Sequence, residues 1–535
     1  MSNDEIGSDT PSHDTTWTAS RDVLAAGPGD IDPAAKGRSR WASRAAIGGA
    51  GVLAMALIGG VTVGVGALTG DGGSQPADAL PTGAFGLVSL DLDPSVGQKL
   101  DGYRFLRKFP TLRDKVPLDG DVRKVFFDAV SDEAGWGDVD YESDVAPWLG
   151  KRLAVGIYAP EGTNADGTAA SPTAVVALQV TDRDKAAAGL KQLSAASTAA
   201  SANDLGWAFS GDYALLAETA DIATRMAAKA EGAPLSEDSQ LKADLAEAED
   251  GVAVAWFDLT AAARELGAES MFLGSGLGTV GSASAGALGR ATMVARFDGP
   301  DVFEVVGRGV GTGTAGWATH GVEGLDTLPQ SSAAVLGIAD GGSLVPKAYD
   351  SMKKSFAGTG MDLDEAVAGL KRDYDITIPD DLAVLLGDNM VVALDGATPG
   401  AVDVGVGARI STDVPAASAV LDKVEAALGG FGAGFTPIRR EVDGDLVLAS
   451  TEAQADRLAA AGTLGDLASF TDAVPDRADA AMVMWADVSR LMTTFGGDGG
   501  STDKDLAAIS GVGLTVASPK GADDVATYRF RLVAR

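Results

Sequence analysis

The chain has 535 residues, of which 46% are apolar, so it is long enough for more than one hydrophobic core. Its 75 aspartates and glutamates outnumber 42 lysines and arginines, and the net charge of -33 argues against a nucleic-acid partner, because phosphates would be repelled. Cysteine is absent and histidine occurs only at His13 and His320, which excludes disulfides, thiolate chemistry and histidine clusters.

Residues 1–44 are predicted to form a disordered acidic tail that ends in a basic stretch. The tail is rich in Asp, Ser, Thr and Pro and has little apolar content, so it cannot bury a core. The basic residues at its end are Lys36, Arg38, Arg40 and Arg44.

Residues 45–69 are predicted to form one transmembrane helix. The apolar part, Ile47 to Leu68, has 22 residues. At 1.5 Å per residue it would span about 33 Å, enough for a hydrocarbon layer of roughly 30 Å. Basic residues precede it and Asp71 follows it, so the positive-inside rule predicts a single-pass protein of the cell membrane with a cytoplasmic N-terminus and an extracytoplasmic body.

Two further interpretations of this region remain open. Ala77-Asp78-Ala79 has the spacing of a signal-peptidase site, but the apolar stretch is longer than a usual signal peptide and ends well before it. Small residues on one helical face would allow a weak helix-mediated dimer in the bilayer; these are Ala56, Gly60 and Gly64.

After a linker at 70–79, the same order of features occurs twice, which predicts two tandem homologous repeats at 80–310 and 328–535 with a glycine-rich linker at 311–327. The first copy is predicted to have strands at 84–90, 153–158 and 173–180, a helix at 184–193, a hairpin at 207–217, a strand at 252–258 and a long hairpin at 291–310. The second is predicted to have strands at 333–338, 391–394 and 402–410, a helix at 417–428, a hairpin at 441–449, a strand at 481–487 and a long hairpin at 512–533.

Each copy also has an amphipathic helix after its first strand, and the two short hairpins have turns at Gly211-Asp212 and Gly444-Asp445. Trp256 and Trp485 fall in matching strands and are expected in the core. Strands joined by hairpins predict an α+β class with mainly antiparallel sheets, in which the repeats are related by a pseudo-twofold axis and meet through uncovered apolar surfaces. The apolar positions of the two helices are Val96, Leu100, Tyr103 and Leu106 in the first and Val345, Tyr349, Met352 and Phe356 in the second.

Several separated motifs resemble actinobacterial single-pass membrane proteins that are grouped only as a domain of unknown function. These motifs are Leu80-Pro81, Leu90 to Pro94, Phe105 to Pro110, and Asp144 with Pro147-Trp148-Leu149-Gly150. The resemblance covers most of the chain and implies a cell-envelope location, with no established activity or site residues.

Catalytic and metal-binding motifs fail in their context. Ser351 and Lys354 match a Ser-x-x-Lys pattern without its partner motifs. The stretches 276–281 and 311–316 match a dinucleotide fingerprint only in letters, since no strand and helix flank them. The alternating acids Asp138, Asp140, Glu142 and Asp144 lack the glycine and glutamate of a calcium-binding EF-hand.

We therefore expect no catalytic residue, cofactor or metal site, and a non-enzymatic envelope protein that binds a protein, a lipid or a wall polymer, or has a structural role. The alternative is an enzyme that acts on envelope glycans through two carboxylates, because Asp and Glu alone can cleave glycosidic bonds. Six tryptophans could stack on sugars, at positions Trp136, Trp148, Trp207, Trp256, Trp317 and Trp485.

Overall fold

The computed structural model describes residues 74–535 except for internal gaps, and all described residues belong to one compact unit, Ala45–Arg535. The gaps are 114–120, 135, 137–138, 161–171, 197–205, 267–288, 312–316, 357–362, 397–404, 431–436, 496–500 and 523.

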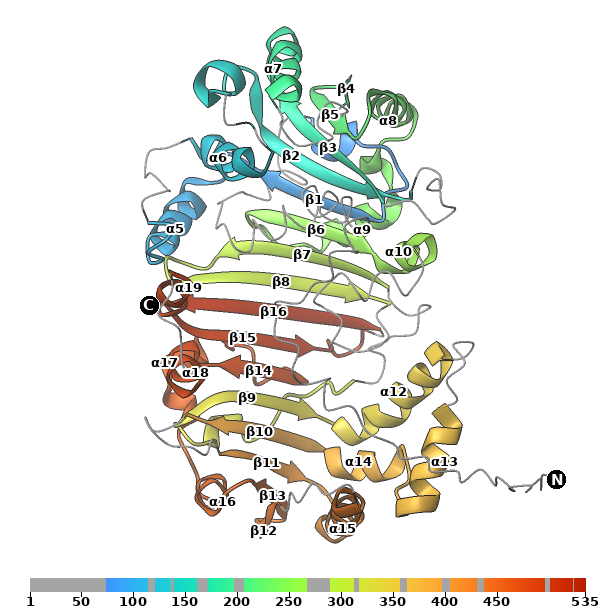
Figure 1. Ribbon diagram of the computed structural model, residues 1–535, viewed down its shortest axis with the longest axis vertical. Helices are drawn as coiled ribbons and strands as arrows, with labels where there is room; N and C mark the ends of the chain where they lie inside the picture. Colours follow the sequence, from blue (N-terminus) through green and yellow to red (C-terminus); the bar gives the residue numbers. More distant parts are fainter. Residues whose placement is uncertain are drawn as a thin grey trace, which may run out of the picture. The chain divides into compact units, whose positions relative to one another are not determined.

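The described strands form one antiparallel sheet (Figure 1). The strands of the N-terminal half are β1 Gly86–Asp91, β2 Leu149–Tyr158, β3 Thr173–Val180, β4 Gly206–Ser210, β5 Tyr213–Ala217, β6 Ala253–Asp258, β7 Arg290–Phe297 and β8 Val302–Val310. Those of the C-terminal half are β9 Ser332–Ala339, β10 Asn389–Asp395, β11 Val406–Ser411, β12 Ile438–Val442, β13 Asp445–Ala449, β14 Met482–Ala486, β15 Ile509–Ala517 and β16 Val525–Ala534.

The strand order is the same when it is read inward from either edge. From one edge it is β4-β5-β3-β2-β1-β6-β7-β8, and from the other it is β12-β13-β11-β10-β9-β14-β15-β16. The two series meet where β8 pairs with β16, from Val302 opposite Val533 to Val310 opposite Val525. We call this pairing the seam.

The predicted fold of two homologous repeats with mainly antiparallel sheets is corrected by the structure, which has a single α+β fold around one large antiparallel sheet and does not show repeats. The halves meet by pairing of two strand edges, and apolar side chains of both halves, among them Phe303 and Ile509, share a buried cluster. Each half ends in a strand whose outer N–H and C=O groups would otherwise be unpaired, and these two edges bond to each other. Equal strand order describes the topology and does not show homology.

The described helices surround the sheet and include none that is long and apolar enough to cross a membrane, which corrects the predicted fold. The tail at 1–44 and the predicted helix at 45–69 lie outside the described residues. The helices are α4 Pro76–Ala79, α5 Val96–Leu106, α6 Val122–Ala134, α7 Arg183–Ala196, α8 Ala220–Gly232, α9 Ser239–Ala246, α10 Leu259–Leu266, α12 Gly341–Phe356, α13 Leu363–Tyr374, α14 Asp380–Leu386, α15 Val414–Gly430, α16 Glu452–Ala459, α17 Ala468–Thr471, α18 Val488–Phe495 and α19 Ser501–Leu506.

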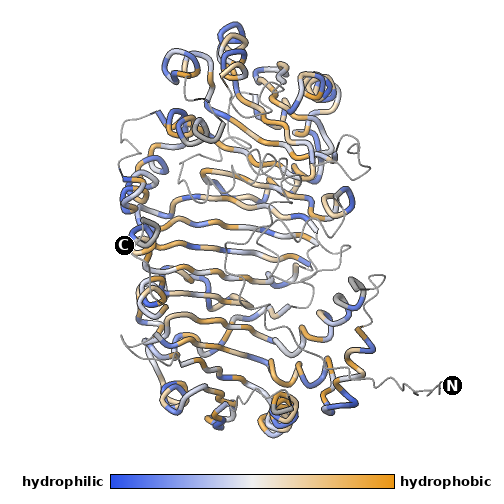
Figure 2. Tube along the Cα trace, in the orientation of Figure 1, coloured by the Kyte–Doolittle hydropathy of each residue, from blue (hydrophilic) through white to orange (hydrophobic). Residues whose placement is uncertain are grey.

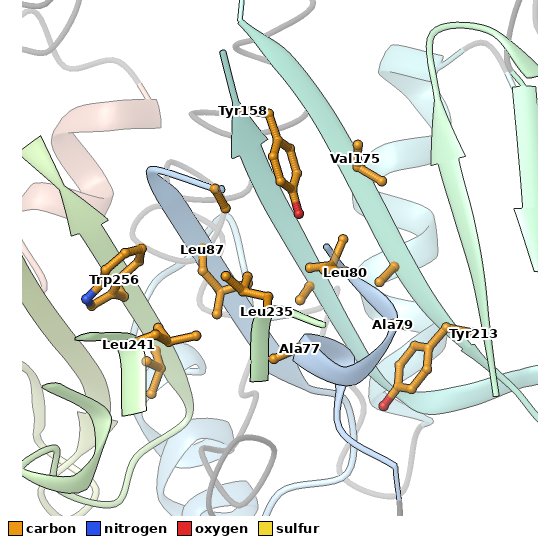
Figure 3. Packing of buried hydrophobic residues seen from close by; sticks show 14 of the residues in the cluster. Ala77, Ala79, Leu80, Leu87, Tyr158, Val175, Tyr213, Leu235, Leu241 and Trp256 are labelled. Carbon is orange, nitrogen blue, oxygen red and sulfur yellow. The ribbon is translucent and has the colours of Figure 1, made fainter. Parts of the chain in front are cut away.

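Several buried clusters support the sheet, with one mainly in each half and one shared between the halves. In the N-terminal half, Trp256 packs in one cluster with Leu87 and Leu235 (Figure 3). In the C-terminal half, Trp485 packs edge-on against Phe470, with ring centroids 5.3 Å apart. Both tryptophans are 2% exposed, so the prediction that they are core residues is confirmed. Hydrophobic residues recur along the strands of both halves (Figure 2).

Local predictions differ from the structure in three places. The linker predicted at 70–79 contains the short helix α4, whose alanines are buried. On α5, Val96 is 80% exposed, and the helix instead buries Phe105 against the sheet, because its packing surface lies at its C-terminal end. The first hairpin turns at Gly211-Asp212 as predicted, but the second turns one residue early, at Asp443-Gly444, where both residues have positive φ.

Candidate functional site

A row of charged residues crosses the seam on one face of the sheet. Arg296 on β7, Glu304 on β8 and Arg531 on β16 are opposite one another in the strand register. Directly opposed residues of antiparallel strands point to the same face, so their side chains meet. The paired rings of Phe297 and Phe303 lie on the other face, with centroids 5.5 Å apart.

Glu304 is the centre of this row. It is fully buried and its carboxylate contacts three guanidinium groups. Arg296 Nη2 lies 2.5 Å from Oε1, Arg529 Nη1 lies 2.8 Å from Oε2, and Arg531 Nε lies 3.1 Å from Oε2. Burial opposes ionisation of Glu304, but the hydrogen bond from Arg296 and the charge of Arg529 outweigh it and hold the carboxyl pKa below its ordinary value.

Beside this row lies a groove of about 350 Å³. Its floor consists of side chains from β7, β8, β16 and β15, which are the strands on either side of the seam. One wall is the segment after α9, and the other is the segment after α17. Each half of the chain therefore supplies two floor strands and one wall. The lining residues used below are Asp244, Glu247, Glu249, Thr292, Arg308, Asp476, Asp479, Thr515, Thr527 and Arg529.

Some wall carboxylates are bound to arginines of the floor strands. Glu249 Oε2 lies 2.5 Å from Arg296 Nη1, and Asp476 Oδ2 lies 2.6 Å from Arg529 Nε. Asp244 is buried and bonds to Arg290 of β7, with Nε and Oδ2 2.6 Å apart. These ion pairs hold both walls on the sheet.

The core tryptophans hold the same walls from beneath. Trp256 Nε1 donates a 2.8 Å hydrogen bond to Asp244 Oδ2 at the end of α9, and Trp485 Nε1 donates one of 2.8 Å to the carbonyl of Ser469 in α17. A buried indole N–H needs an acceptor, so each tryptophan orients the element that leads into a groove wall.

Five groups in the groove have no side-chain partner among the described residues. Arg308 lies on the floor, between Thr292 of β7 and Thr527 of β16 in the register. The hydroxyls of Thr292 and Thr515 are unpaired although these residues are only 5% and 4% exposed. The carboxylates of Glu247 and Asp479 are unpaired and exposed, one on each wall.

The free state of Arg308 contrasts with its neighbours. The other arginines of β7, β8 and β16 all form ion pairs: Arg290, Arg296, Arg529 and Arg531. In a groove with acidic walls, a guanidinium that binds no carboxylate remains available to a ligand.

No described residue of the motifs considered in the sequence lines this groove. Ser351 and Lys354 occur on α12, and 276–281 lies outside the described residues, as does most of 311–316. Asp140 accepts a 2.9 Å hydrogen bond from the Ser143 backbone and caps a short π-helical turn, Tyr141–Val145, which holds the pKa of its carboxyl below its ordinary value. Over the described part of the chain, no group of His, Asp and Glu is arranged to hold a metal ion.

His320 lies beside Asp340, with Nε2 and Oδ2 3.2 Å apart on an exposed surface. Among the other tryptophans, Trp148 is 1% exposed and Trp207 is half-buried beside Phe209. None of the tryptophans lines the groove. No groove residue belongs to a motif of the sequence, although Thr527, Arg529 and Arg531 alternate with apolar residues in a predicted strand, which is the signal of a polar face.

Comparison with known proteins gives a family match for part of the chain. Residues 46–206 match proteins of unknown function grouped as DUF3352, a region that ends at β4 and excludes the groove. No curated protein and no solved structure matches the chain.

Proposed function

We propose that this protein is a non-enzymatic binding module that takes a small polar ligand in the groove at the seam. The observation that carries the proposal is the set of unsatisfied polar groups on the floor. The hydroxyls of Thr292 and Thr515 and the guanidinium of Arg308 face the groove without a side-chain partner among the described residues, so a polar ligand would supply their hydrogen bonds. A volume of about 350 Å³ is at the small end of the range for small-molecule sites.

The competing function is glycan hydrolysis by two carboxylates. Three groove carboxylates, those of Asp244, Glu249 and Asp476, are bound to arginines, so their oxygens are already engaged by the protein. Only Glu247 and Asp479 are free to act as an acid and a base on opposite walls. Binding is the better supported function, because the ion pairs fix the walls and the unpaired donors of the floor can form hydrogen bonds to a bound ligand.

We also propose that the module acts at the cell membrane, on its outer side. Support comes from the sequence alone: an uncharged stretch from Ala45 to Leu68 follows basic residues and precedes a strongly acidic body. Protease added to cells whose wall has been removed should digest the body and spare residues 1–44. Protection of the body would reject this location.

The binding function is tested by thermal unfolding of the full-length chain with three probes: alanyl-alanine, cellobiose and glycerol 3-phosphate. One probe class should raise the melting temperature of the wild type, because a ligand at about 100 times its Kd stabilises the folded state by roughly 2.7 kcal/mol. The same probe should not stabilise Thr527→Trp, in which an indole fills the groove.

Thr224→Trp on the exposed face of α8 is the matched control and should respond as the wild type does. Circular dichroism establishes that both variants fold. If no probe stabilises the wild type, or if Thr527→Trp responds equally, the groove is not a binding site. Cleavage of a cell-wall glycan that disappears in Glu247→Gln or Asp479→Asn would establish the enzyme instead.

A further inference from the structure

We infer that the ligand is a short zwitterion with a free carboxylate and a free ammonium group, such as a dipeptide or the exposed end of a wall peptide. The inference rests on the proposed function and specifies its ligand. It follows from the signs and positions of the groups that lack partners.

The floor of the groove is suited to an anionic group. Arg308 presents a planar guanidinium, which binds carboxylates through two parallel hydrogen bonds. Thr292 and Thr527 lie on either side of it in the strand register, and Thr292 has a free hydroxyl that can donate a further hydrogen bond. A single carboxylate would thus satisfy donors from two strands of the N-terminal half, whereas the hydroxyl of Thr527 already donates to the carbonyl of Ala517.

The walls of the groove are suited to a cation. Glu247 and Asp479 are free, so with Arg308 the unpaired groups comprise two negative charges and one positive charge. A purely anionic ligand, such as a phosphate ester, would form an ion pair with Arg308 but would be repelled by the carboxylates of both walls. A neutral sugar would leave the guanidinium without a counter-charge. A ligand with a carboxylate at one end and an ammonium at the other can pair with Arg308 and with the free wall carboxylates.

The size of the groove favours a ligand longer than one amino acid. Its volume of about 350 Å³ corresponds to roughly twelve water molecules at about 30 Å³ each. Arg308 lies on the floor and the free carboxylates lie on the walls, so a ligand that reaches both must place its two charges apart. In an extended dipeptide the terminal charges are separated by a full residue.

The test is isothermal titration of the full-length chain with alanyl-alanine and its two blocked forms, N-acetyl-alanyl-alanine and alanyl-alanine amide. Alanyl-alanine should bind, and removal of either terminal charge should weaken binding at least tenfold. In Arg308→Gln the amide should bind as well as the free dipeptide, because the carboxylate no longer has its partner. In the double variant Glu247→Gln, Asp479→Asn the acetylated form should bind as well as the free dipeptide.

Matched controls remove the same charges elsewhere. Arg104→Gln on α5 and Glu231→Gln on α8 change exposed residues that do not line the groove and should keep the wild-type preference for both free ends. This pattern separates loss of a specific contact from a change in net charge.

Failure of the inference can be distinguished from failure of the proposed function. If cellobiose or glycerol 3-phosphate binds in a manner blocked by Thr527→Trp while alanyl-alanine does not bind, the zwitterion is wrong and the binding groove remains. Equal binding of free and blocked dipeptides overturns the zwitterion as well. If none of the probes binds, both the ligand class and the binding function are rejected.

Discussion

The two halves of the sheet have the same strand order but different side chains at the strands that join them. β8, the last strand of the N-terminal half, contributes Glu304 to the seam, whereas β16, in the corresponding position, contributes Arg529 and Arg531. The halves are alike in topology and complementary in charge.

This difference indicates how the chain selects the correct edge pairing. An exposed edge strand can pair with a copy of itself, which leads to aggregation. If β16 paired with the β16 of a second molecule so that Arg529 lay opposite Arg531, arginines would face arginines without the carboxylate of Glu304 between them. Like charges directly opposite each other are destabilising, so the charge pattern favours pairing of β8 with β16 within one chain.

Removal of the central carboxylate should have the largest effect. Glu304→Gln leaves three guanidinium groups around a buried neutral amide, and loss of one partner of a buried ion pair costs roughly 3–5 kcal/mol. Urea denaturation should show this decrease in the free energy of unfolding. Glu231→Gln, an exposed change of the same kind, should stay within about 0.5 kcal/mol of the wild type. A decrease below about 1 kcal/mol in Glu304→Gln would mean that the arginines do not depend on this carboxylate.

The ion pairs of Glu304 should make the free energy of unfolding depend on pH in the acid range. In the folded chain the carboxyl pKa of Glu304 lies below 4.5, which is the ordinary value for a glutamate. As the pH falls, Glu304 is therefore protonated first in the unfolded chain. The stabilisation is therefore complete above about pH 4.5 and is lost as the pH falls below this value through the folded pKa. The difference in unfolding free energy between wild type and Glu304→Gln should be constant from pH 7 to about 5 and then decrease. A difference that is unchanged at about pH 3 would contradict this account.

The tryptophans of the two halves should differ in their response to the same substitution. Trp256 donates to the carboxylate of Asp244 and Trp485 donates to a neutral backbone carbonyl. Hydrogen bonds to charged groups contribute about 1.5–3 kcal/mol and neutral ones about 1. Trp256→Phe should therefore destabilise the chain more than Trp485→Phe, by about 1 kcal/mol in thermal or urea unfolding. The reverse order would show that packing, and not the hydrogen bond, decides how much stability each substitution removes.

The smallest expected effect is at the two outer strands. β4 has two buried residues and is covered by α8, whereas no residue of β12 is buried. The amides of β12 should exchange with solvent faster than those of β4, with an opening free energy lower by about 1 kcal/mol. Hydrogen exchange read by mass spectrometry measures both strands in one experiment. Equal protection would show that the outer edges of the two halves are equally stable.

Much of the sheet was predictable from the sequence, because alternation of apolar residues and turn residues are local signals. The strand at 173–180 was predicted with the bounds that β3 has, and the strand predicted at 252–258 corresponds to β6. The pairing of β8 with β16 was not predictable in this way, since it joins strands more than two hundred residues apart through backbone groups that every residue possesses.

Local sequence patterns do not predict the groove either, because its residues are also far apart in the sequence. Its floor combines Thr292 and Arg308 with Thr515 and Thr527, and no spacing in the sequence links these positions. Glu304 was equally inconspicuous, because a single acid among 75 becomes important only when three arginines from neighbouring strands surround it.

The seam itself can be tested by a disulfide, because the chain contains no cysteine that would interfere. Val305 of β8 is directly opposite Phe530 of β16. Opposed residues have Cα atoms about 4.5–5.5 Å apart, within the range that a disulfide spans. In a control pair, Val305→Cys is combined with Ala526→Cys, four residues farther along β16 and about 13 Å away.

Oxidation of the Val305→Cys, Phe530→Cys variant at low protein concentration should give an intramolecular disulfide, identified by mass spectrometry of the linked peptides. The control pair should remain reduced. This result would establish that the two halves form one sheet through β8 and β16. Intermolecular disulfides alone, or equal crosslinking of the control pair, would contradict the seam.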